Sequence, residues 1–347
     1  MTSTERVLTA LRGGMPDRLP VMEMFIDPKI INALRPGMSY EDFVDDQDLD
    51  AVTCLTMAND PADIDWVDKE QGIWKDKWGA LQKRTFDVMS IITPPAPIET
   101  ESDLESYEPP DPAKAPVLKY LKKLVNRFKG RRAVVVVGEE TFAPTQYLRA
   151  GLEDLMVDYI FRPEFVKKMA RVAEEYHVEL YRRLIADGAE VVVLGDDFAG
   201  KIGPFMSPAH FEEFIFPSLK NVVGEIKSAG ALCVHHTDGD IWKIMDLLIA
   251  SGLDGLGPLE PAHMNLDEVR KYSSGKLSVV GNLDVDLLSR GTVEEVRAAT
   301  REMIARVSPS GGHVLSSGNT ISSSVRPENY LSMVETAREY GRYPIRA

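Results

Sequence analysis

The chain has 347 residues, 44% of them hydrophobic, so it can bury a large core. Its formal net charge of −14 argues against a nucleic-acid partner, because phosphate binding needs a basic stripe and the Lys/Arg clusters are only short local runs such as 129–132. No apolar run approaches the roughly 18 residues of a membrane span, and residues 1–14 lack the pattern of a signal peptide, so we expect a cytoplasmic protein without a membrane partner.

Eight short apolar segments alternate with helical stretches along the chain. They are 19–26, 51–55, 133–138, 191–195, 231–236, 255–258, 277–281 and 313–317. Helix-start signals precede several of the stretches between them, such as Ser207-Pro208 before an expected helix over 209–228, Thr292 before two glutamates, and Arg326-Pro327. This alternation predicts an α/β protein with a (β/α)8 TIM barrel, built as a single domain over 1–347.

One interval breaks the alternation. About 77 residues separate the second and third predicted strands, and they include Trp74 and Trp78 followed by an alternating stretch, 81–89. This pattern predicts a β-hairpin insertion, within about 60–116, that extends over the barrel mouth. The two tryptophans would supply aromatic walls for a substrate, although such a pair is as often plain packing within a hairpin.

Polar side chains follow almost every predicted strand, at the end where TIM barrels form their active sites. They are Glu23 or Asp27, Asn59 and Asp60, Glu139 and Glu140, Asp196 and Asp197, His236 and Asp238, Glu260, Asn282 and Asp284, and Asn319. The set surrounds one histidine with carboxylates and amides and contains no lysine or arginine, so a divalent cation would balance its charge.

His236 and Asp238 form the centre of this predicted site. Residues i and i+2 of a strand point to the same side, so these two side chains can reach one ion or one substrate together. We expect the metal ligands to be His236, Asp238 and Glu140, with Asp196 as the other candidate for the third place. This ligand set suits zinc, with manganese or iron as alternatives.

Each of these residues also has a structural interpretation. Asp238 could cap a helix next to a core histidine, His236. Asp196 and Asp197 could cap the helix that follows them, and Asn282 with Asp284 could form an Asx-turn. No nucleophile elbow, Walker loop or dinucleotide fingerprint offers a competing chemistry.

Five segments of the chain resemble the uroporphyrinogen decarboxylase superfamily, and the likeness runs from about residue 5 to Pro344. They are 196–198, 205–208 with Phe214 and Pro217, 236–240, 281–284, and 317–319 with 327–329. The resemblance implies a (β/α)8 barrel and one of two chemistries. One is cofactor-free decarboxylation of a porphyrinogen, and the other is zinc-dependent methyl transfer with a corrinoid protein.

The residues favour methyl transfer. The decarboxylases carry an arginine-rich segment after the first strand and a catalytic aspartate in an F-S-D-I-L segment after the second, where this chain has 23–27 and 57–60. Tyr147 matches the decarboxylase tyrosine, but its segment occurs across the superfamily. The thiol-methylating members use an H-x-C zinc site plus a distant cysteine. Here His236 matches, whereas Asp238 and Asn319 stand at the cysteine positions.

Loss of two thiolates makes a bound ion a harder Lewis acid, better suited to an oxygen-linked methyl group. The resemblance thus implies a metal-dependent methyltransferase that moves a methyl group from a small O-methylated donor to a corrinoid (cobalamin) on a separate protein. The chain lacks the D-x-H-x-x-G motif of a cobalamin carrier. The expected catalytic residues are His236, Asp238, Asp196 and Tyr147, and the expected substrate-binding residues are Glu23, Asp197, Trp74, Trp78, Asn282 and Asn319.

The alternative is a carboxy-lyase without a metal. In that case Asp60, Tyr147 and His236 would act on a carboxylated substrate, as in the decarboxylases of the superfamily.

Overall fold

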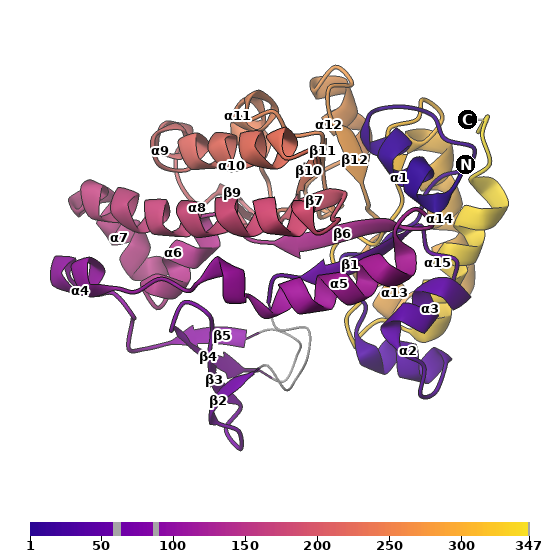
Figure 1. Cartoon of the computed structure of the whole chain (residues 1–347). Coiled ribbons are helices and arrows are strands. Elements are labelled where there is room, and N and C mark those ends of the chain that lie inside the picture. The colour runs from indigo at the N-terminus through magenta and orange to yellow at the C-terminus, as the bar shows by residue number, and fades with distance from the viewer. Residues whose placement is uncertain (58–63, 86–89, 346–347) are drawn as a thin grey trace.

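The computed structural model describes residues 1–57, 64–85 and 90–345, and its centre is a curled parallel sheet of seven strands (Figure 1). In spatial order the strands are β1 (Ala51–Leu55), β6 (Ala133–Gly138), β7 (Val191–Leu194), β10 (Leu232–His235), β11 (Gly255–Leu256), β12 (Ser278–Val280) and β13 (His313–Val314). Most are valine-rich and buried on both faces, as in parallel sheets covered by helices. The α/β class predicted from the sequence is confirmed.

Helices connect the strands and cover the outer face of the sheet (Figure 1). They are α1 (Ser3–Leu11), α2 (Pro28–Leu34), α3 (Tyr40–Asp46), α4 (Glu101–Ser106), α5 (Pro116–Phe128), α6 (Phe142–Leu148), α7 (Leu152–Phe161), α8 (Pro163–Ala186), α9 (Pro208–Phe214), α10 (Phe216–Ser228), α11 (Met245–Ala250), α12 (Leu266–Tyr272), α13 (Val285–Arg290), α14 (Val293–Val307) and α15 (Pro327–Tyr340), with short 3-10 turns η2 (Pro112–Lys114) and η3 (Trp242–Ile244). None of the helices in the described ranges is both long and apolar enough to cross a bilayer.

The helix-start signals read from the sequence are confirmed. Ser207 accepts a hydrogen bond from the amide of His210, and Thr292 forms a capping box with Glu295. The helix expected over 209–228 is divided into α9 and α10 at Ile215. The break lies two residues before Pro217, which lacks the amide that would continue the hydrogen-bond pattern.

The first predicted strand, 19–26, does not form a regular strand. It makes isolated parallel bridges from Val21 to Leu315 and from Ile26 to Ile321, while the carbonyl of Val21 accepts the amide of Asp50. The segment therefore links the two edge strands of the sheet, β1 and β13. Pro20 has no amide to donate, and the hydroxyl of Tyr40 accepts the amide of Thr53 in β1, so a continuous ladder does not form.

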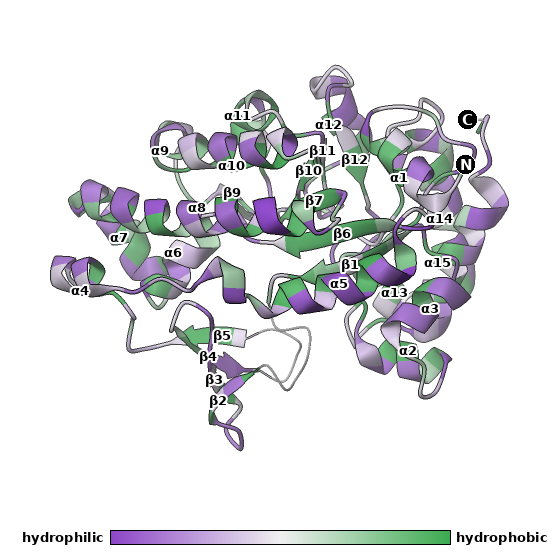
Figure 2. Cartoon of the chain, in the orientation of Figure 1, coloured by the Kyte–Doolittle hydropathy of each residue, from purple (hydrophilic) through white to green (hydrophobic). Residues whose placement is uncertain are grey.

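The strand residues alternate between two buried clusters. Val135, Val193 and Val234 pack inside the curl together with residues of α1, whereas Leu194 and Cys233 pack outside, beneath the helices. Figure 2 shows the strands of the large sheet mostly in green and the surrounding helices in a mixture of green and purple. Because successive side chains of a strand point to opposite faces, this alternation decides which residues at the strand ends face inward.

Helix α1 covers the amino-terminal end of the sheet. Its residues Val7, Ala10 and Leu11 are buried in the inner cluster, and the hydroxyl of Ser278, at the start of β12, donates to carbonyls of Ala10 and Leu11.

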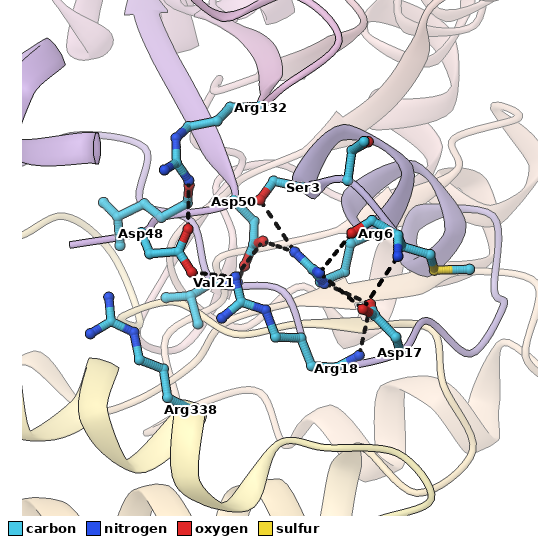
Figure 3. A network of polar contacts seen from close by, with 12 residues as sticks. Ser3, Arg6, Asp17, Arg18, Val21, Asp48, Asp50, Arg132 and Arg338 are labelled. Atoms are coloured by element: carbon cyan, nitrogen blue, oxygen red, sulfur yellow. Dashed lines mark hydrogen bonds and ion pairs between the residues drawn. The ribbon is translucent and has the colours of Figure 1, made fainter. Parts of the chain in front are cut away.

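Arg6 of α1 joins a network of ion pairs at this end (Figure 3). It pairs with Asp17 and with the buried Asp50, which also pairs with Arg18. The opposite, carboxyl end of the strands carries the polar residues singled out in the sequence.

Between β1 and β6 the chain forms a separate antiparallel sheet of four strands, β2 (Asp65–Asp68), β3 (Ile73–Lys75), β4 (Leu81–Arg84) and β5 (Ser90–Thr93). The sequence predicted a hairpin in this region, and the observed insertion is this larger sheet. It lies below α6 in the view of Figure 1.

Candidate metal-binding site

Three side chains converge at the carboxyl ends of β7 and β10. Asp197 follows β7, and His236 and Asp238 follow β10. One ligand atom from each of the three lies within 4.8 Å of the others. Strand alternation explains the position of His236, because it has the same parity as Val234, which faces the inside of the curl. The group runs from the buried His236 to the exposed Asp197, so solvent can reach it.

The orientation of His236 leaves one ring nitrogen free. Its Nδ1 lies 2.6 Å from the carbonyl oxygen of Pro258, which can only accept a hydrogen bond. In the neutral ring Nδ1 therefore carries the proton, and Nε2 has the lone pair. Nε2 lies 3.8 Å from Oδ1 of Asp238, so the lone pair is directed toward the carboxylates. A backbone carbonyl that fixes the tautomer in this way is a common partner of metal-binding histidines.

Asp238 is held through its carboxylate and through its backbone. The side-chain amide of Asn319 donates to both of its oxygens, each at 2.9 Å. The backbone amide of Asp238 donates to Oδ1 of Asp197 at 2.8 Å, and the next amide, of Gly239, donates to Glu260. These contacts bring Asn319, which is 81 residues away in the sequence, into the site.

Negative charge accumulates in this group. The pKa of the Asp238 carboxyl is raised to about 6, because burial and the neighbouring Asp197 and Glu260 carboxylates outweigh the opposing effects of His236 and Asn319. The arrangement therefore offers one nitrogen and several oxygen atoms to a positive ligand, with an excess of carboxylate over positive charge.

Glu140 and Asp196, the predicted candidates for the third ligand, are not part of this group. Asp196 has the parity of Leu194, which faces outward, and its carboxylate accepts the backbone amides of residues 140–143 at the start of α6. Both oxygens of Glu140 are buried and have no hydrogen-bond partner among the described residues. Burial raises the pKa of Glu140 well above its ordinary value, and Asp196 adds to the effect. Asp197 takes the third place in the group.

Two other predicted site residues are held in structural contacts. Glu23 is buried and accepts hydrogen bonds from the amide and the hydroxyl of Ser317, and burial raises its pKa to about 8. The side-chain amide of Asn282 donates to the carbonyls of Leu259 and Met264.

The aromatic candidates lie in and around the inserted sheet. Trp78 is only 1% exposed and packs against Tyr176 and His177 of α8, so its ring does not form an open wall. Trp74 is half-buried in β3 and packs edge-on against Trp66. Tyr147, on α6, lies beside Glu139. A hydrogen bond between the two side chains helps to lower the pKa of the Glu139 carboxyl. Asp60 and Asn59 lie outside the described residues.

The structure also gives contacts to Pro258 and Lys77, which sequence analysis did not name, and to Glu260, which it named only as a polar residue after a strand. Pro258 and Glu260 contact the group from the loop after β11, and Lys77 of the insertion pairs with Glu139. The sequence alone shows that Asp197 and Val193 point to the same face of the sheet. It does not predict the contact between Lys77 and Glu139, because 62 residues separate the two.

Comparison with known proteins shows the family to which the chain belongs. The family model described as uroporphyrinogen decarboxylase (URO-D) matches residues 86–340, and the chain belongs to this family. A uroporphyrinogen decarboxylase of Geobacter metallireducens is 24% identical over 246 residues, which are 69% of this chain and 70% of the relative.

Two solved structures share the fold. A methyltransferase from Methanosarcina mazei superposes with a TM-score of 0.77 at 20% identity, over 98% of this chain and 99% of the other. A B12-independent methionine synthase from a Shewanella species gives a TM-score of 0.52 at 12% identity, over 94% of this chain and 96% of the other. At these identities the likeness concerns the fold.

Proposed function

We propose that this protein is a metal-dependent methyltransferase that moves a methyl group from a small O-methylated donor to a corrinoid on a separate protein. The observation that carries the proposal is the group of Asp197, His236 and Asp238 at the carboxyl ends of the strands. The proposal includes closure of the curled sheet into a (β/α)8 barrel, with residues 19–26 as the eighth segment.

The residues present fit a divalent ion. The free Nε2 of His236 and the carboxylate oxygens of Asp197 and Asp238 are ligands that zinc accepts, and they are close enough to share one ion. A cation would also offset the repulsion among Asp197, Asp238 and Glu260. With one nitrogen and oxygen donors, a bound ion would be a hard Lewis acid able to polarise the oxygen of a methyl ether.

The other residues would hold this arrangement in place. Asn319 fixes the orientation of the Asp238 carboxylate, Pro258 fixes the tautomer of His236, and Glu260 holds the backbone of Gly239. Partners of this kind keep the ligands in one geometry, which lowers the free-energy cost of binding. The donor oxygen would take a proton after the methyl group leaves, giving an alcohol or a phenol as the product.

The corrinoid would come from a partner. The chain has no D-x-H-x-x-G motif, so the methyl acceptor has to approach the carboxyl end of the strands on another protein. Similarity in fold to the Methanosarcina methyltransferase is compatible with such a reaction.

A second candidate function is metal-free decarboxylation, which the names of the curated relatives favour. Tyr147 stands beside Glu139, whereas the position of the arginine-rich segment holds Glu23 and its neighbours. An acidic, arginine-poor mouth would repel a polyanionic porphyrinogen.

Metal content and methyl transfer separate the two candidates. We expect about one divalent ion per purified chain, loss of that ion in His236→Ala, and retention in His210→Ala, a histidine of α9 outside the group. We also expect methylcobalamin to form from cob(I)alamin and a methoxylated compound. Full metal retention in His236→Ala, or carbon dioxide release from uroporphyrinogen without cobalt methylation, would contradict the proposal.

A further inference from the structure

The loop between β3 and β4 carries a lysine to the carboxyl end of the large sheet. The carboxylate of Asp76 accepts the amides of Trp78 and Ala80, and Gly79 has a φ of 83°, which suits glycine in a tight turn. These contacts fix the backbone on both sides of Lys77, whose ammonium lies 2.7 Å from Oε2 of Glu139.

Trp78 anchors the loop. Its ring is buried against Tyr176 and His177, and its carbonyl accepts the hydroxyl of Tyr107. The loop is thus attached to α8, while Lys77 points to the residue that directly follows β6. Because neighbouring strands lie about 4.8 Å apart, Glu139 at the end of β6 is one strand away from Asp197 at the end of β7.

The positive partner of this ion pair is the more exposed one. The side chain of Lys77 is 21% exposed, and that of Glu139 is 6% exposed. The carboxylate faces His177, whose Nε2 lies 3.8 Å away, and Tyr147. The Lys77 side chain is therefore the part of this pair that solvent can reach, and its ammonium has donors left after its contact with Glu139.

Lys77 stays charged in this position. Burial alone would lower its pKa, but Glu139, Tyr176 and Asp76 together outweigh burial and raise the pKa above the ordinary value. Within the part of the chain that the structure describes, Lys77 is the one lysine or arginine that pairs with a carboxylate at the carboxyl ends of the large-sheet strands.

We propose that Lys77 is a specificity-determining residue that binds a carboxylate of the substrate, so that the methyl donor is a methoxylated acid. The statement that the acid donates a methyl group rests on the proposed function. The binding of its carboxylate by Lys77 does not. Asp197, Asp238 and Glu260 would repel an anionic group, and Lys77 supplies the opposite charge at the same end of the sheet.

The test compares acids with their neutral amides. The probes are methoxyacetate and 4-methoxybenzoate against methoxyacetamide and 4-methoxybenzamide, with binding measured by titration calorimetry on the metal-loaded protein. We expect at least one acid to bind about tenfold or more tightly than its amide, as a charge-assisted hydrogen bond would give. Lys77→Met should abolish this preference by weakening acid binding much more than amide binding, and Lys77→Arg should restore most of it.

Glu139→Gln is the matched control. If Lys77 binds the acid, removing its carboxylate partner keeps or increases the preference for acids. If Lys77 only attaches the insertion, Glu139→Gln and Lys77→Met should weaken all four ligands alike, and that result would overturn the inference. The double variant Lys77→Met/Glu139→Gln, which leaves no buried charge unpaired, replaces Lys77→Met if the single variant does not fold.

Two further outcomes are decisive. Equal binding of acids and amides by the wild-type protein, or binding of neither acid, refutes the inference. A Lys77-dependent preference for acids without any methyl transfer to cob(I)alamin supports the carboxylate site and refutes the methyltransferase function, so the two failures can be told apart.

Discussion

Glu23→Gln should remove a pH-dependent loss of stability. Glu23 is 2% exposed, and burial raises its pKa from 4.5 to about 8 although Ser317 donates two hydrogen bonds to it. The folded state therefore holds a proton that the unfolded chain releases above pH 4.5. Stability falls as the pH rises from 4.5 to about 8, by about 1.4 kcal/mol for each pH unit. Over the whole window the loss amounts to about 5 kcal/mol, an upper estimate.

Urea denaturation between pH 5 and pH 9 tests this reasoning. Glutamine keeps the size of the side chain and an oxygen acceptor for Ser317, but it does not titrate. The two proteins should have similar free energies of unfolding near pH 5, and the variant should be several kcal/mol more stable at pH 9. Other groups titrate in both proteins, so the difference between the two curves is the relevant quantity. Parallel curves across the range would refute the assigned pKa.

Further predictions concern the site and the insertion. Asp197→Asn should lower zinc affinity strongly and Glu140→Gln should leave it nearly unchanged, which chelator competition can measure; the reverse order would restore Glu140 as the ligand. Asn319→Ala should weaken zinc binding about 10- to 100-fold without a change in fold by circular dichroism, and unchanged affinity would remove its orienting role. Trp78→Ala should cost about 3–5 kcal/mol of unfolding free energy and Trp74→Ala much less, and equal costs in denaturant melts would contradict the observed burial.

Local pattern was enough to predict most of the large sheet. The valine-rich runs of β6 and β7 are recognisable because buried parallel strands are apolar on both faces. The segment 19–26 is also mostly apolar, but whether it pairs as a strand depends on contacts that its neighbours make with distant residues. Tyr40 occupies the amide of Thr53, and this contact joins residues that the pattern of a single segment does not connect.

The site was predicted in part, and alternation accounts for the difference. His236 and Asp238 come together as expected, with Asn319 donating to Asp238. The third residue of the group is Asp197 and not Asp196, because the two side chains point to opposite faces of the sheet. Val193 and Leu194 are both apolar, so the sequence did not show which of these faces lies inside the curl. The contact between Lys77 and Glu139 depends on how the insertion docks, which no local pattern specifies.

The position of α1 has a consequence for the order in which the chain can fold. The partners that α1 needs at the amino end of the sheet include Ser278 of β12 and Val314 of β13. During synthesis these residues appear about 270 or more positions after Ala10, so α1 is made first and completes its packing among the last elements. Until then the cluster around Val7 and Leu11 lacks Val280 and Val314. Contacts this distant in sequence slow folding and leave apolar surface exposed in the nascent chain.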